Sequence, residues 1–175
     1  MSLVNLTIDC ATARNAGLKY LHLIETANLT SMTLSSGSTS DFGTITLASG
    51  AVFKTIGFEQ DYAEYRENTE VERQAAKTTH EIEFYVPGVN ADSRDALEAL
   101  KSEVPCGYIA VIEDNNSNKW VIGYSTEHGK TRPMRLLTDE TTTAKALGET
   151  NGSTVTLQSI DSVKAYTVSA AIVTS

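Results

Sequence analysis

Residues 107–124 read GYIAVIEDNNSNKWVIGY, and this stretch decides the fold class. Two runs rich in β-branched and aromatic residues are joined by an Asp/Asn/Ser cluster, whose residue types tolerate the left-handed backbone conformations of tight turns. The pattern predicts a β-hairpin. The alternating oxygen-bearing residues that start at Asp114 are also how a calcium-binding loop begins. Lys119 and Ser125 stand where that loop requires Gly and Glu, so a turn is the better interpretation.

Strand patterns continue on both sides of this hairpin. Residues 18–25 carry apolar side chains on both faces, which predicts a strand covered on both sides, and residues 82–86 alternate cleanly. Further extended segments are expected at 3–8, 32–34, 44–47, 52–62, 134–137, 154–158 and 163–173. The predicted fold is mainly β (α+β), a single domain over residues 1–175. It has two packed antiparallel sheets, as a β-sandwich or barrel, with one flanking helix and a long charged loop.

One helix is predicted, over residues 91–103. Asn90 is a suitable N-cap, and Pro105 prevents the helix from continuing. Leu97 and Leu100 share one face, so this helix should lie on a sheet. The strand residues expected to surround these two leucines are Phe84, Val111 and Trp120.

The composition is that of a folded, acidic protein. The 175 residues include 14 Lys and Arg against 22 Asp and Glu, which gives a net charge of −8. Proteins that bind duplex nucleic acid neutralise phosphates with basic residues, so this charge argues against nucleic-acid binding. No apolar stretch approaches the roughly 20 residues needed to cross a bilayer, and the N-terminus lacks a secretory signal pattern. Synthesis in the cytosol is therefore expected.

The sequence lacks the common catalytic and metal-binding motifs. It contains no Walker phosphate-binding loop, no dinucleotide-binding glycine motif and no nucleophile elbow. Cys10 and Cys106 lie far apart and are expected to be buried free thiols. His22 lies in an apolar strand and is expected in the core, whereas His80 and His128 have polar neighbours and no zinc-binding spacing. We therefore expect no enzymatic activity, no cofactor and no bound metal.

Residues 59–81 form a charged segment with few aliphatic side chains. Such a segment cannot bury itself against its own domain, and long connections of this kind are usually functional or disordered. It is either a solvated loop tip or, over residues 60–79, an assembly arm that becomes ordered against a neighbouring subunit. The charged residues assigned to this arm are Glu64, Arg66, Glu67, Glu70, Glu72, Arg73 and Lys77.

The order of these elements resembles the tail-tube (major tail protein) family of tailed bacteriophages. The resemblance spans residues 55–168 and rests mainly on 110–116 (AVIEDNN), 120–124 (WVIGY) and 141–148 (TTTAKALG). It implies a virion structural protein without catalytic residues. Subunits of that family form a ring whose inner sheets make a continuous tube, and the long charged loop contacts the next subunit or ring.

The resemblance also implies partners and a location. The chain would bind copies of itself and other virion tail proteins, and it would reside in the virion after synthesis in the host cytoplasm. DNA would be passing cargo rather than a specific ligand, no membrane would be involved, and an acidic surface suits a tube through which DNA slides.

Two other classes of function are compatible with the residues. A β-sandwich module of a virion or cell surface that binds a carbohydrate or receptor would expose aromatic side chains on one sheet face. Tyr62, Tyr65, Tyr85 and Tyr124 are the candidates for that role. An enzyme would need a converging polar pocket, which the sequence does not reveal.

Overall fold

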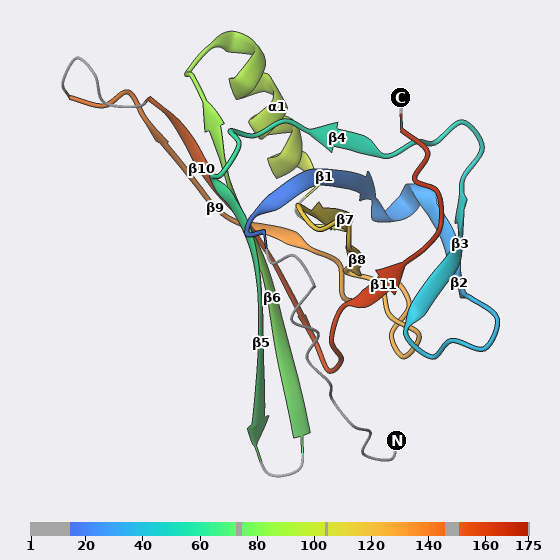
Figure 1. The fold of residues 1–175 in the computed structure, drawn as a ribbon. Helices are drawn as coiled ribbons and strands as arrows, with labels where there is room; N and C mark the ends of the chain where they lie inside the picture. Colours follow the sequence, from blue (N-terminus) through green and yellow to red (C-terminus); the bar gives the residue numbers. More distant parts are fainter. Residues whose placement is uncertain (1–14, 73–74, 104, 146–150, 175) are drawn as a thin grey trace.

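The computed structural model describes residues 15–72, 75–103, 105–145 and 151–174 (Figure 1). A seven-stranded sheet has the strand order β2-β3-β11-β8-β7-β1-β4, in which only the β11–β3 pair is parallel. Its strands are β1 Leu18–Glu25, β2 Leu29–Leu34, β3 Asp41–Leu47, β4 Lys54–Ile56, β7 Tyr108–Asp114, β8 Lys119–Ile122 and β11 Tyr166–Val168. A 3-10 turn, Thr26–Asn28, connects β1 to β2.

A second, four-stranded sheet is antiparallel throughout and has the order β5-β6-β10-β9. Its strands are β5 Ala63–Glu72, β6 Ala75–Pro87, β9 Arg135–Thr142 and β10 Gly152–Asp161. The distal part of the β5–β6 hairpin projects beyond the rest of the described chain (Figure 1). The mainly β fold with two packed sheets and one flanking helix is therefore confirmed.

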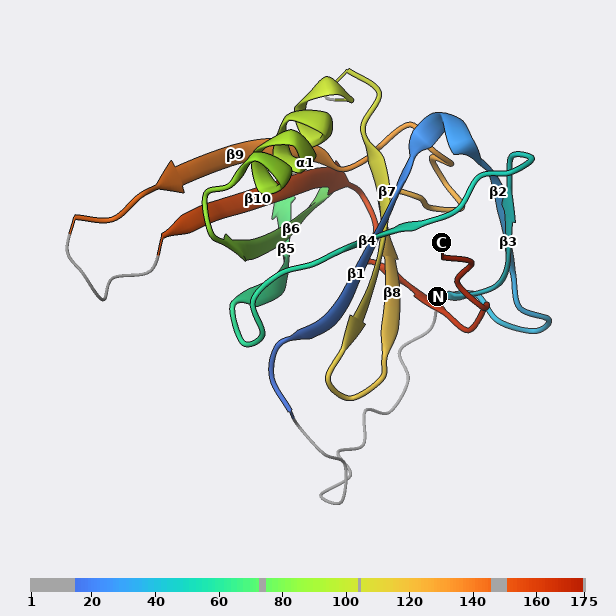
Figure 2. The same ribbon diagram turned by 90° about the horizontal axis from the view of Figure 1, so that it is seen from above.

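Two apolar clusters form the core, one on each face of the seven-stranded sheet. The first cluster lies between the two sheets, where Leu21 and Ile112 meet Phe84 and Leu157. The second cluster lies on the opposite face, where β2, β3 and β11 contribute to it, and it includes Phe42. Figure 2 shows the two sheets side by side, with helix α1 beside β9 and β10.

Helix α1, Ala91–Ser102, is held at both ends and along one face. The Asn90 side chain accepts from the Ser93 backbone N–H at 2.8 Å, and the Ser93 hydroxyl receives the Asn90 N–H, which makes a capping box. Leu97 and Leu100 are its buried residues, and both belong to the cluster between the sheets. The predicted helix and its docking face are confirmed.

The expected surroundings of the helix are correct for Phe84 and Trp120 but wrong for Val111. Phe84 belongs to the same cluster as Leu97, and Trp120 packs against that cluster. Val111 lies in the second cluster, on the opposite face of the sheet. Strand β7 is buried on both faces from Tyr108 to Ile112, so apolarity alone could not assign a face to Val111.

The charged segment around residues 60–79 is not an irregular connection. The structure forms it into the two long strands of the β5–β6 hairpin. Both faces of the distal hairpin are exposed, so the apolar alternation that reveals a strand is missing there. Strand β9 runs to Thr142, beyond the expected 134–137, for the same reason.

Other boundaries also differ from expectation. Within 52–62 only β4 is a strand, and the chain turns at Asp61, which has a φ of 69°. Within 163–173 only β11 is a strand, and the segment expected at 3–8 lies outside the described residues. Cys106 is exposed rather than buried because it lies in the turn after α1, and Cys10 lies outside the described residues.

Candidate functional site

The β5–β6 hairpin places most of the predicted arm residues on one face of the four-stranded sheet. The register pairs Glu64 with Glu83, Arg66 with Glu81 and Glu70 with Lys77, so these residues point away from the seven-stranded sheet. Glu72, at the end of β5, lies on the same face, so the exceptions are Glu67, which points to the opposite face, and Arg73, which lies outside the described residues.

Glu67 belongs to a polar cluster beneath the hairpin. The Tyr65 hydroxyl lies 2.8 Å from His80 Nδ1 and 3.1 Å from Glu67 Oε2. His80 Nε2 lies 3.1 Å from the Val163 carbonyl oxygen, and the Ala165 N–H donates to Glu67 Oε2 at 2.9 Å. The cluster therefore links both strands of the hairpin to the segment that leads into β11.

The single hydroxyl proton of Tyr65 has two acceptors when His80 is neutral. His80 Nε2 must donate to the Val163 carbonyl, so Nδ1 is left to accept from Tyr65. Glu67 Oε2 competes for the same proton. Burial is the largest influence on His80 and lowers its pKa, which favours this neutral ring, and burial raises the pKa of Tyr65.

The structure corrects the prediction that His22 lies in the core, and it buries His80 instead. His80 is 3% exposed, whereas His22 is only partly buried and contacts Thr55 Oγ1 at 2.9 Å. The signal that could have identified His80 is its spacing: it lies two and four residues before Ile82 and Phe84, on the face that enters the core.

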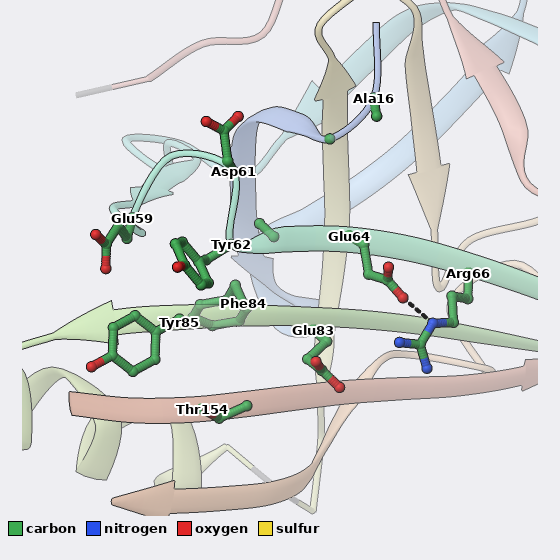
Figure 3. Close-up of a pocket in the computed structure, with 12 residues that line it drawn as sticks. Ala16, Glu59, Asp61, Tyr62, Glu64, Arg66, Glu83, Phe84, Tyr85 and Thr154 are labelled. Carbon is green, nitrogen blue, oxygen red and sulfur yellow. Dashed lines mark hydrogen bonds and ion pairs between the residues drawn. The ribbon is translucent and has the colours of Figure 1, made fainter. Parts of the chain in front are cut away.

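A cleft of about 500 Å³ opens at the base of the hairpin (Figure 3). Carboxylates line it, and the ring of Tyr62 lies 6.0 Å from that of Tyr85. An ion pair joins Arg66 to Glu64 at one side. The carboxylates that line the cleft are Glu59, Asp61, Glu64 and Glu83. This arrangement suits a cationic group better than an anionic one.

The sheet face that includes this cleft is polar and mostly acidic. Cross-strand neighbours continue from β6 onto β10 and β9, and the Gln158 amide donates to Glu81 at 2.7 Å within one such row. The acidic residues of this face are Glu64, Glu70, Glu72, Glu81, Glu83 and Glu140, and the basic ones are Arg66, Lys77 and Arg135. We refer to it below as the outer face of the four-stranded sheet.

The four candidate tyrosines do not share this face. Tyr62 and Tyr85 are neighbours at the cleft, but Tyr65 lies on the inner side of the sheet, stacked 6.4 Å from Trp120. Tyr124 packs against the second apolar cluster, where its hydroxyl accepts from the Met32 N–H at 3.2 Å. The aromatic platform expected for a binding module is thus reduced to two rings.

No three His, Cys, Asp or Glu side chains in the described part of the chain are grouped so as to hold a metal ion. Among the same residues, no helix combines the length and apolarity that a membrane span requires. The chain matches no protein-family model, no curated protein and no solved structure.

Proposed function

We propose that this chain is a non-enzymatic virion structural protein that assembles with copies of itself into rings. The rings would form the tail tube of a bacteriophage, or an adjoining tail component, through which DNA passes. The observation that carries the proposal is the four-stranded sheet, whose edge strands β5 and β9 both lack an outer partner among the described residues. Open edges of this length are ready templates for pairing with another chain.

The direction of the edge strands suits ring formation. Because every neighbouring pair in the sheet is antiparallel, β5 and β9 run in opposite directions. Strand β9 of one copy can therefore join β5 of the next as an ordinary antiparallel pair. Head-to-tail contacts of this kind close into a ring when the rotation between copies allows it.

The charge of the outer face is consistent with DNA as passing cargo. A continuous sheet formed by edge pairing would keep the outer faces of all copies on the same side. If that side faces the lumen, its glutamates repel phosphates and prevent DNA from adhering. The proposed partners are therefore further copies of this chain and other virion tail proteins, and the proposed location is the virion.

The experiment is electron microscopy of concentrated protein, together with its mass in solution. The wild-type chain should form rings or tubes. A shortened variant, in which an Asn-Gly turn replaces residues 70–77, joins Thr69 to Thr78, a pair already in register. This variant keeps Tyr65, Glu67 and His80, which form the polar cluster, whereas a longer deletion of residues 64–76 would remove Tyr65 and Glu67. We expect this variant to retain its thermal stability and to assemble less well.

A wild-type chain that stays monomeric at high concentration would contradict the proposal. If the shortened variant is folded and assembles as the wild type does, the distal hairpin has no role in assembly and the arm assignment is wrong.

The second candidate is a β-sandwich binding module for a carbohydrate or receptor. The observation that favours it is the cleft, where Tyr62, 62% exposed, faces Tyr85 beside several carboxylates (Figure 3). A monomeric mass, combined with saturable quenching of fluorescence by a glycan that Tyr62→Ala abolishes, would favour this function over assembly.

A further inference from the structure

The tip of the hairpin exposes an apolar side chain between two acidic ones. Val71 is 71% exposed, near the end of β5, and Glu70 and Glu72 flank it. Lys77 lies across from Glu70 in the register, but no ion pair joins them in the structure. Strand alternation places Glu70 and Glu72 on the outer face and Val71 on the opposite face.

A groove that carries positive charge lies where β9 begins and β10 ends. It has a volume of about 360 Å³, and Leu137 and Ile160, 52% and 41% exposed, lie on its lip above the buried Pro133. Arg132 and Arg135 line the same groove and are exposed, and neither forms an ion pair with any described carboxylate. The groove thus combines an apolar lip with two free positive charges.

We infer that the hairpin tip of one copy, residues 70–72, docks into the groove formed by Arg132, Pro133, Arg135, Leu137 and Ile160 of a second copy. This contact rests on the proposed self-assembly and names the surface that receives the arm. The two surfaces match in charge, because Glu70 and Glu72 of the tip and Arg135 of the groove all lie on the outer face. The tip cannot reach the groove of its own copy, since β6 and β10 separate β5 from β9.

The strand register supports the same pairing. If β5 joins β9 of a neighbour with Arg66 opposite Glu140, both charges lie on the outer face. Strand β9 has an irregularity that leaves Leu137 unpaired between Leu136 and Thr138. Skipping Leu137 in the same way brings Glu70 level with Arg135, and Glu72 follows on the same face at the groove. One register therefore satisfies charges at both ends of the contact.

Cross-linking tests whether the two surfaces meet between copies. Glu70→Cys and Leu137→Cys are made separately in a Cys10→Ser/Cys106→Ser background, and each protein carries a tag of different mass. After mixing under assembly conditions, a short bismaleimide should produce the mixed dimer. The control pairs Glu70→Cys with Val173→Cys, an exposed valine elsewhere on the surface, and should yield little product.

Charge reversal tests the chemistry of the contact. Glu70→Lys/Glu72→Lys and Arg132→Glu/Arg135→Glu should each raise the protein concentration needed for assembly by about tenfold or more, because each places like charges in contact. All four substitutions in one chain should restore assembly. Asp95→Lys/Glu98→Lys, an equal charge change on exposed helix positions, should have little effect.

The outcomes separate this contact from the proposed function. If rings form without the mixed cross-link and tolerate both charge reversals, the proposed ring assembly is supported and the proposed docking of the tip is wrong. A mixed cross-link in small oligomers that never close supports the docking and contradicts the ring. A monomer that yields no cross-link at any concentration contradicts both.

Discussion

Replacing Tyr65 with Phe removes the hydroxyl that joins the two strands of the hairpin to the core. The ring stays in place, so its stacking on Trp120 is preserved, and Glu67 keeps the Ala165 N–H. The variant loses one hydrogen bond, and the buried acceptor His80 Nδ1 no longer has a donor. A buried group without its partner costs about 1–3 kcal/mol, so we expect the free energy of unfolding to fall by about 2–3 kcal/mol.

The assay is urea unfolding followed by Trp120 fluorescence, with thermal unfolding as a second measurement. For a chain of this length the expected loss corresponds to a decrease in Tm of about 4–12 °C. Tyr62→Phe is the matched control, because its hydroxyl lies on an exposed side chain and should change stability by less than about 0.5 kcal/mol. If the two variants lose the same amount, the Tyr65 hydroxyl does not stabilise the fold and the cluster is only a coincidence of positions.

Two further predictions concern the core and its pH dependence. Leu100→Ala should cost about 2–5 kcal/mol in urea unfolding, because Leu97 is the only other buried side chain of α1; a loss within about 0.5 kcal/mol would mean that the helix is not anchored there. Burial lowers the pKa of His80 below its unfolded value of about 6.5, despite the opposing charges of Glu67 and Asp161. The unfolded chain therefore binds more protons below that value, so stability present above pH 6.5 should be lost as the pH falls towards the folded pKa. His80→Gln should flatten this part of the pH profile, and an unchanged profile would contradict the assignment.

The elements that carry local signals were predictable from the sequence. Asn90 and Pro105 bracket the helix with groups that satisfy or interrupt backbone hydrogen bonds, and the structure ends the helix at Ser102. Strand β1 occupies 18–25 as expected. The turn after Asp114 also follows from local chemistry, since its carboxylate accepts the N–H groups of Asn116 and Asn118.

The remaining features depend on contacts between distant parts of the chain. The hairpin at 63–87 has a polar pattern because its distal half meets only solvent, so no periodicity marks it. His80 became a core residue because Val163 and Glu67 supply its partners, and neither is near it in sequence. The groove between β9 and β10 joins residues about 25 positions apart, such as Arg135 and Ile160, and only the sheet register brings them together.

The position of β11 sets a condition on when the protein can fold during synthesis. This strand lies between β3 and β8, parallel to one and antiparallel to the other, and Tyr166 packs 5.0 Å from the ring of Phe42. Until residues 166–168 leave the ribosome, no strand pairs the β2–β3 hairpin with the rest of its sheet. A nascent chain therefore carries two unpaired strand edges and a Phe42 that lacks its contact with Tyr166, which are features that promote aggregation. Slower synthesis at low temperature prolongs that interval, so a chaperone that shields strand edges should raise the yield of folded protein more than cooling does.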